Sequence, residues 1–416
     1  MSALAARALA DGLDVARVRA DFPCLDQTIH GRPLVFLDTA ASAQKPNAVI
    51  ETLTSVLRHD YANIHRGVYD LSQRATDLHE AARAKVQALL HAADSREIVF
   101  TRNATEGINL VAQSFVRPRL VPGDQVLITG MEHHANIVPW QLLADQAGLE
   151  LVVAPINDDG ELLLDPFEAL ITERTKLVSV TWVSNALGTI NPVHEIVALA
   201  HRRGVPVLLD AAQAVQHLPV DVQELDCEFL VFSGHKLYGP SGIGVLYGQA
   251  DLLEAMPPYQ GGGEMISSVS FAGTEFADIP YKFEAGTPAI EAAVGLGAAI
   301  DYVQSLGLDN IAAHEADVLA YATRAMQQVP GVRLVGTARH KCSVLSFVMD
   351  QAHPQDIGTV LDLDGIAVRV GHHCAQPAIE RLGHSATARA SLGLYNTRAD
   401  IDALVASLHR IAAMFG

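Results

Sequence analysis

The sequence predicts an α/β fold built around a mainly parallel, doubly wound sheet and followed by a smaller α+β unit. Between Glu97 and Gly248, short apolar runs alternate with helical segments, which is typical of a parallel sheet covered on both faces. After about residue 298, helices and strands occur in blocks instead, which indicates a second unit of α+β type. A chain of 416 residues with 49% hydrophobic content can bury both cores.

The first element expected is an N-terminal helical segment over residues 1–30 that packs with the smaller unit. Val15, Val18 and Phe22 lie at helical spacing and would form its apolar face. The elements expected after it are a short strand at 34–38, a helix opening at Pro46, a polar break at 62–67 and a helix at 76–91.

The larger unit is expected to span residues 31–298 and to hold the parallel sheet. Its strands are near-continuous apolar runs, as expected for strands buried on both faces. They are expected at 97–100, 126–129, 151–155, 177–183, 205–210, 229–232 and 243–247.

The smaller unit is expected to span residues 299–416. A long helix at 289–306 leads into it from the larger unit. Its expected elements are helices at 309–328 and 398–414 and strands at 332–335, 344–349 and 366–370.

Composition argues against several classes of partner. The formal net charge is -18 and the pI is near 5.4, so neither nucleic acid nor an anionic membrane is expected as a partner. Charges interrupt every long apolar stretch, and we expect neither a membrane span nor a secretory signal. The four cysteines are far apart and form no C-x-x-C pair. That spacing predicts neither disulfides nor a metal site, and it suits a reducing cytoplasm.

A lysine at the end of an apolar strand is the centre of the predicted chemistry. Residues 231–236 read Val-Phe-Ser-Gly-His-Lys, and apolar neighbours would desolvate the Lys236 ammonium and lower its pKa. A partly neutral amine is what Schiff-base chemistry requires. The alternative is a lysine that ends the strand with its charged group in water.

Two further strand ends favour a cofactor beside that lysine. Asp210 ends the run 207–210, at the sheet edge where parallel sheets bind ligands. It could pair with the pyridinium nitrogen of pyridoxal phosphate (PLP), and Gln213 could donate to the phenolic oxygen of the ring. Thr105 lies at a helix start after the strand at 97–100, where N–H groups and its hydroxyl form a phosphate site. A turn role for Asp210 and an ordinary N-cap role for Thr105 are the alternatives.

His133 and Asn185 follow two other strands of the sheet. The imidazole of His133 could stack on an aromatic cofactor, and the Asn185 amide would lie near the ring and the substrate carboxylate. A structural histidine and a turn residue before Gly188 are the alternatives.

The smaller unit carries a thiol and an isolated arginine. Cys374 closely follows the strand at 366–370, and Arg369 and two histidines beside it favour a thiolate. Arg389 stands alone in the apolar run 388–392 and needs an anion, which a substrate α-carboxylate would supply. The alternatives are an inert cysteine, a His-His-Cys metal site that lacks a fourth ligand nearby, and an internal ion pair for Arg389.

Four motifs occur together and in order along the chain. They are Asp210-Ala211-Ala212-Gln213, Ser233-Gly234-His235-Lys236, Met131-Glu132-His133-His134-Ala135-Asn136 and Arg369-Val370-Gly371-His372-His373-Cys374-Ala375. From about Asp21 to the C-terminus, the sequence resembles the SufS-type (group II) cysteine desulfurases of the class V aminotransferase superfamily. The resemblance implies a fold-type I, PLP-dependent transferase whose smaller unit carries the catalytic cysteine.

The resemblance also implies roles for residues that the pattern alone leaves open. It implies that Ser233 and His235 contact the cofactor and that Arg369 and His65 contact the substrate. It implies a hairpin after the glycines at 261–263, a homodimer, and a phosphate contact from Thr287 to the neighbouring subunit. The implied catalytic residues are Lys236, Cys374 and His133.

The implied reaction converts L-cysteine to L-alanine, with the sulfur held on Cys374 as a persulfide and supplied to iron–sulfur cluster assembly. A small sulfur-acceptor protein of the SufE or SufU type is the implied partner, since a cysteine so close to its strand has little reach. A selenocysteine lyase would use the same lysine, whereas transamination or kynurenine cleavage would not need Cys374. A non-catalytic scaffold of the same fold would bind no cofactor.

Overall fold

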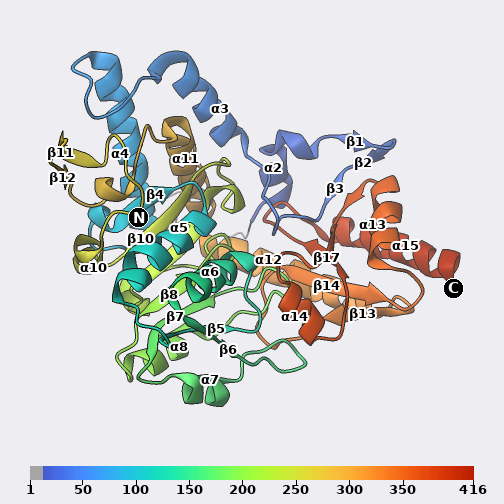
Figure 1. The fold of residues 1–416 in the computed structure, drawn as a ribbon. Coiled ribbons are helices and arrows are strands. Elements are labelled where there is room, and N and C mark those ends of the chain that lie inside the picture. Colours follow the sequence, from blue (N-terminus) through green and yellow to red (C-terminus); the bar gives the residue numbers. More distant parts are fainter. Residues whose placement is uncertain (1–12) are drawn as a thin grey trace.

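The computed structural model describes residues 13–416 (Figure 1). Residues 1–12 of the predicted N-terminal segment lie outside the described residues. The described part of that segment contains helix α2 (Val15–Ala20), and Phe22 is buried just beyond the end of the helix. The Phe22 ring packs edge to face, at centroid distances of 5.9, 5.7 and 4.9 Å, on Tyr238, Tyr302 and Tyr395.

A seven-stranded sheet forms the centre of the larger unit (Figure 1). In spatial order its strands are β4 (Ile98–Thr101), β10 (Gly244–Gly248), β9 (Phe229–Ser233), β8 (Val207–Asp210), β7 (Thr175–Thr181), β5 (Gln125–Thr129) and β6 (Glu150–Ala154). Strand β10 is antiparallel to both neighbours, and the four pairs from β9 to β6 are parallel. The predicted mainly parallel sheet is therefore confirmed.

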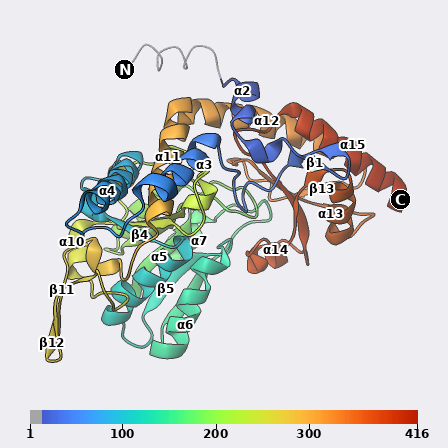
Figure 2. The ribbon, with the colours of Figure 1, turned by 90° about the horizontal axis from the view of Figure 1, so that it is seen from above.

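Helices cover both faces of this sheet (Figures 1 and 2). Because side chains alternate along a strand, Leu230 and Phe232 of β9 face one core cluster and Phe229 and Val231 face the other. The first cluster includes α4 (Asp70–Leu90), α7 (Leu164–Leu170), α8 (Val193–His201), α9 (Val222–Leu225) and α11 (Ile290–Leu306). The second includes α5 (Ala104–Leu110), η4 (Val111–Val116), α6 (Val138–Ala147) and α10 (Ala250–Ala255). The sheet is doubly wound, as predicted.

The smaller unit is a four-stranded antiparallel sheet with helices packed on it (Figure 1). Its strand order is β13 (Val332–Val335), β14 (Val344–Met349), β17 (Thr387–Ser391) and β16 (Arg369–Gly371). Its helices are α12 (Leu308–Gln327), α13 (Pro354–Leu363), α14 (Gln376–Arg381) and α15 (Arg398–Phe415). The α+β type predicted for this part of the chain agrees with the structure.

The strand predicted at 366–370 is divided in two. Strand β15 (Ile366–Ala367) pairs in parallel with β3 (Val35–Phe36), whereas β16 pairs with β17 in the other sheet. Leu37 is also buried in the core of the smaller unit. Backbone pairing thus attaches residues 35–38 to the smaller unit, and the predicted boundary at residue 30 stays a prediction.

Other elements differ little from the expectations. The helix predicted from residue 76 begins at Asp70, and the helix at Pro46 is α3 (Asn47–Ser55). After the glycines at 261–263, the chain forms the projecting hairpin β11–β12 (Ile266–Ser270 and Gly273–Phe276; Figure 2). Strands β1 (Thr28–Ile29) and β2 (Arg32–Pro33) form another antiparallel two-stranded sheet. Among the helices of residues 13–416, none is long and apolar enough to cross a membrane.

Candidate active site

The carboxyl ends of the parallel strands bring the predicted residues of the larger unit together. Asp210 ends β8 and pairs with Thr181 at the end of β7, and β9 ends next to it at Ser233. A cavity of about 440 Å³ opens at this edge, against the smaller unit. The predicted residues that line it are Thr105, His133, Asn185, Asp210, Gln213, Ser233, His235 and Lys236 from the larger unit, and Arg369, Cys374 and Arg389 from the smaller unit.

Lys236 and Asp210 are two buried titratable groups that line the cavity. Lys236 closes the short 3₁₀ turn Gly234–Lys236 that follows β9. Burial lowers the pKa of Lys236, and the Asp210 carboxylate opposes that shift. Burial raises the pKa of Asp210, while Lys236 and the N–H of Ala212, which donates at 3.0 Å, oppose it. The desolvated amine that the sequence predicts is therefore present.

Hydroxyl groups gather at the start of helix α5. Asn103, not Thr105, caps this helix, because its Oδ1 accepts the Glu106 N–H at 3.0 Å. The exposed Thr105 hydroxyl has no side-chain hydrogen bond within residues 13–416, so it is free for a ligand. Ser233 Oγ accepts the Ala104 N–H at 2.9 Å, which leaves its own proton to donate.

The histidines of the cavity are neutral at pH 7. Burial, with the nearby Lys236 charge, lowers the pKa of His133 to about 3. Its Nδ1 accepts the Ala135 N–H at 3.0 Å, so its proton lies on Nε2. Burial also lowers the pKa of His235 to about 4 and that of His373 to about 3.

Gln213 is held mainly by the protein. Its Nε2 donates to the Ala40 carbonyl at 2.6 Å, and its Oε1 accepts from Gln216 at 3.2 Å. One amide proton is left for a ligand, which agrees with the contact predicted for Gln213 but limits it to a single hydrogen bond.

Cys374 lies exposed on a tightly held loop. His373 and Cys374 both have a φ of 56°, a left-handed conformation that is costly for two successive residues other than glycine. The His134 N–H donates to the Cys374 carbonyl at 2.7 Å, and Asn185 Nδ2 donates to the His373 carbonyl at 2.6 Å. The Gln376 N–H donates to His134 Nε2 at 3.1 Å. Both sides of the thiol are thus anchored to the larger unit.

The two arginines share one carboxylate, that of Asp38. Arg389 Nη2 lies 3.2 Å from Asp38 Oδ1, and Arg369 donates to both oxygens at 3.2 and 2.9 Å. Arg389 Nη1 donates to the Asn185 carbonyl at 2.8 Å, and its buried Nε has no partner in the described chain. Burial lowers the pKa of Arg389 to about 10. The internal ion pair that the sequence analysis gave as the alternative for Arg389 is therefore present, with Asp38 as the partner. The buried Nε of Arg389 is still available to donate to a ligand.

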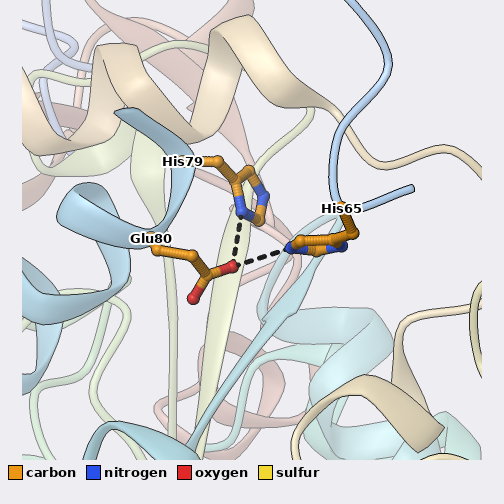
Figure 3. A group of neighbouring side chains, drawn as sticks. All are labelled: His65, His79 and Glu80. Atoms are coloured by element: carbon orange, nitrogen blue, oxygen red, sulfur yellow. Dashed lines mark hydrogen bonds and ion pairs between the residues drawn. The ribbon is translucent and has the colours of Figure 1, made fainter. Parts of the chain in front are cut away.

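His65 does not line this cavity. The Nε2 atom of His65 lies 3.1 Å from Oε1 of Glu80, and the Nδ1 atom of His79 lies 3.2 Å from the same oxygen (Figure 3). The three possible ligand atoms lie within 4.8 Å of one another, but Arg83 Nε already donates to Glu80 at 3.0 Å. We therefore interpret this group as a hydrogen-bonded cluster. Within one chain this cluster holds the His65 imidazole away from the cavity, so the predicted contact of His65 with the substrate stays a prediction.

Thr287 also lies outside the cavity of its own chain. It is exposed and lines a second cavity of about 240 Å³ together with Thr101, Arg102 and Tyr259. The predicted phosphate contact from Thr287 requires a second subunit, so it stays a prediction.

Asp38 is the residue of this site that sequence analysis missed. It lies two residues beyond the short strand β3 and forms a backbone bridge with Ser391. An acidic residue at a strand end was a usable signal, as it was for Asp210. The partner of that acid could not be predicted, because Asp38 and Arg389 are 351 positions apart.

The cavity fits PLP in its donor set. It offers a desolvated amine, a buried carboxylate at 5% exposure and free hydroxyl protons at the start of α5. These groups match the aldehyde, ring nitrogen and phosphate of that cofactor. The neutral His133 adds an aromatic face beside them.

Comparison with known proteins defines the class. The family of class-V aminotransferases matches residues 35–404, so the chain belongs to this PLP-dependent family. A cysteine desulfurase from Dickeya dadantii is 55% identical over 403 residues, which cover 97% of this chain and 98% of that protein. Within the family, the chain belongs with the cysteine desulfurases.

Solved structures agree with this placement. The cysteine desulfurase CsdA from Escherichia coli is 41% identical with a TM-score of 0.90, and 97% of this chain and 99% of CsdA are covered. An apo cysteine desulfurase from Thermococcus onnurineus is 36% identical with a TM-score of 0.91, covering 97% of this chain and 98% of that one. The predicted fold-type I architecture is confirmed.

Proposed function

We propose that the chain converts L-cysteine to L-alanine and keeps the sulfur on Cys374 as a persulfide. One observation carries this proposal: Lys236 of the larger unit and Cys374 of the smaller unit line the same cavity. An amine that moves a proton and a thiol that receives a sulfur atom are the two groups that this reaction needs from the protein.

The residues of the larger unit are proposed to hold the cofactor. Bound PLP supplies an electron sink next to the substrate carbon. Lys236 holds it covalently, and Asp210 keeps a proton on the ring nitrogen. The remaining proposed contacts are His133 on the ring face, Gln213 at the phenolic oxygen, Thr105, Ser233 and His235 around the phosphate, and Thr287 from a second copy of the chain.

The substrate carboxylate is proposed to lie against Arg389 and Arg369. The unused, buried Nε donor of Arg389 supports this placement, because such a donor is costly unless a ligand accepts from it. Asn185 lines the same wall, but its amide already donates to His373. Its proposed contribution is therefore mainly to hold the loop of Cys374.

Lys236 and Cys374 then carry the chemical steps. Once the substrate amine has taken its place on the cofactor, the released Nζ of Lys236 takes the proton from the substrate Cα, with neutral His133 as a second proton carrier. The Cys374 thiolate attacks the substrate sulfur, so an S–S bond forms as the substrate C–S bond breaks. The electron pair of the broken bond remains on the substrate Cβ, which takes up a proton, and Lys236 returns a proton to Cα before the product leaves as alanine.

Several finer assignments belong to the same proposal. We infer a SufS-type (group II) enzyme that acts as a homodimer in the cytoplasm and supplies sulfur to iron–sulfur cluster assembly. The anchored loop of Cys374 supports the expectation of a small acceptor protein of the SufE or SufU type, since the thiol cannot travel to a distant acceptor. L-cysteine is the proposed substrate because the curated relatives are cysteine desulfurases.

Mass analysis of the protein after reaction with L-cysteine tests the persulfide. The Cys374 peptide is expected to gain the mass of one sulfur atom, and dithiothreitol should remove it. Cys24 is also exposed, so its peptide is the matched control for adventitious sulfur transfer. Equal labelling of Cys24 and Cys374, or no labelling of Cys374, would overturn the proposal.

A further inference from the structure

Lys45 is a half-buried cation that lies beside the turn of Lys236 without lining the cavity. Its Nζ donates to the carbonyl oxygen of His235 at 3.0 Å and also to that of Ala43. Burial lowers the pKa of Lys45 to about 8, so the amine is largely protonated at pH 7. Among the described residues, no carboxylate pairs with it. Two backbone carbonyls therefore stand where a counter-ion would.

The carbonyl oxygen of His235 is held by three donors from one stretch of chain. Besides Lys45, the N–H of Ala43 donates to it at 3.1 Å and Oγ of Ser42 donates at 3.4 Å. This carbonyl belongs to the peptide bond that joins His235 to Lys236. Because a peptide unit is planar, bonds to its oxygen also fix the Cα of Lys236, from which the reactive side chain starts.

The ammonium is the strongest of these three donors. A hydrogen bond from a charged donor is roughly twice as strong as one between neutral groups. The stretch that carries Lys45 has its own support, because the N–H of Gln44 donates to Oη of Tyr395 at 3.3 Å. That oxygen also lies 2.8 Å from Oγ1 of Thr39. Lys45 thus ties the His235 carbonyl to a stretch that is fixed independently.

The other side of the same turn is held by the main chain alone. The N–H of Gly234 donates to the Ile243 carbonyl at 2.9 Å, and the Gly234 carbonyl accepts from the Leu237 N–H at 3.0 Å. In the proposed reaction, Nζ of Lys236 must reach both the aldehyde carbon of the cofactor and the Cα proton of the substrate. A misplacement of about 1 Å can slow such a step by about a hundredfold, so the contact from Lys45 bears directly on this step.

We propose that Lys45 is a positioning residue that holds the peptide of Lys236 through the His235 carbonyl and so sets where Nζ of Lys236 meets the substrate Cα. This inference rests on the proposed function, in which Lys236 moves the Cα proton. Lys45 lies outside the cavity lining and acts through the turn. Loss of its ammonium is therefore expected to slow the proton transfer without removing the group that performs it.

The test follows the exchange of the Cα proton of L-alanine with solvent deuterium, measured by proton NMR with PLP-loaded, full-length protein. In the proposed function this step uses Lys236 and not Cys374, so it is separate from sulfur transfer. Lys45→Met keeps nearly the length of the side chain and removes the charge. It is expected to lower the exchange rate at saturating L-alanine by about tenfold. Lys45→Arg supplies charged donors again and should restore most of the rate.

Lys282→Met is the matched control. Lys282 is also buried and also donates to a backbone carbonyl, that of Glu254 at 2.8 Å, but it lies outside the cavity lining. Its loss should lower the unfolding free energy and leave the exchange rate per bound cofactor unchanged. If Lys45→Met likewise lost only stability, Lys45 would have a structural role alone and the proposal would be overturned.

A second readout does not depend on turnover. When PLP is added to PLP-free protein, the rise of absorbance reports bond formation at Lys236. Lys45→Met should slow this rise severalfold, whereas Lys282→Met should match the wild type. Ser42→Ala removes a weaker donor to the same carbonyl and should slow both rates to a smaller extent, which gives a result even if Lys45→Met does not fold.

Lys236→Ala separates the failure of this inference from the failure of the proposed function. If Lys236→Ala exchanges the Cα proton at the wild-type rate, the proposed role of Lys236 is wrong. If Lys236→Ala abolishes the exchange while Lys45→Met and Ser42→Ala exchange like the wild type, the role proposed for Lys45 alone is overturned.

Discussion

Asn185 donates its side-chain N–H to the carbonyl oxygen of His373 across 2.6 Å. This bond joins the edge of the larger sheet to the loop that presents Cys374, whose own carbonyl accepts from His134. Because His373 and Cys374 both adopt left-handed conformations, such contacts are needed to hold the loop. The relationship fixes the direction from which the thiol faces the cavity.

Asn185→Ala is expected to loosen that loop. The unpaired His373 carbonyl should cost roughly 1–3 kcal/mol of unfolding free energy, and the misplaced thiol should lower kcat for sulfide release by at least about tenfold. Denaturant unfolding and rates at saturating L-cysteine check both effects. Asn310→Ala is the matched control, since Asn310 of helix α12 donates to the carbonyl of Leu306, the last residue of α11, and should affect stability alone. An unchanged kcat in Asn185→Ala would contradict the role of the anchor.

Glu284→Gln is expected to destabilise the larger unit. Arg83 donates to both Glu284 oxygens at 2.7 and 3.0 Å, and their side chains are 2% and 7% exposed. Breaking such a buried pair should cost about 3–5 kcal/mol. The control is Asp317→Asn, whose pair with Arg398 is half exposed and should contribute far less to the unfolding free energy, because solvent screens it. If urea unfolding showed equal losses of unfolding free energy in the two variants, burial would not strengthen the Arg83–Glu284 pair, and the prediction would be wrong.

The buried histidines predict a loss of stability in acid. The pKa of His133 and of His373 is about 3 in the folded chain, against an ordinary value of 6.5. Above pH 6.5, both are neutral whether the chain is folded or not. As the pH falls from 6.5 towards 3, the unfolded chain takes up protons that the folded chain excludes. The unfolding free energy should therefore fall by about 1.4 kcal/mol per pH unit for each histidine.

The variant His373→Gln measures how much His373 contributes to the change of the unfolding free energy with pH. Its unfolding free energy should depend on pH less steeply than that of the wild type, by the contribution of one histidine, between about pH 4 and 6. The exposed His409→Gln is the control. Identical slopes for wild type and His373→Gln would show that His373 is protonated in the folded chain.

Sulfur should leave Cys374 slowly without a protein acceptor. The loop is anchored on both sides of the thiol, so the acceptor must approach Cys374 rather than the reverse. Sulfide release from L-cysteine is expected to accelerate severalfold when a small acceptor protein with an exposed cysteine is added. The control is the same acceptor with that cysteine changed to serine. Full turnover with a small thiol alone would count against this account.

The core of the site was predictable because it depends on local patterns. Asp210 and Lys236 each follow an apolar strand, and parallel strands bring their carboxyl ends to one edge. Arg389 was recognisable as an isolated charge in an apolar strand, and it proved to be 1% exposed. These inferences need the order of apolar and polar residues but no knowledge of distant contacts.

The contacts between distant segments could not be predicted from such patterns. The pairing of β3 with β15 joins residues near the two ends of the chain, and the two-residue strands carry little periodic signal. The same holds for Asp38, whose partners lie more than 300 positions away. The bond between the His65 imidazole and Glu80 of the following helix, α4, is another contact that the sequence pattern did not predict.

The production of alanine and sulfide from L-cysteine, measured together, tests the central claim most directly. The PLP-loaded wild-type protein should release the two products in equal amounts under reductant, and Cys374→Ala should release neither at a comparable rate. Alanine formation by Cys374→Ala at the wild-type rate would contradict the persulfide route and would favour a lyase that does not use this thiol.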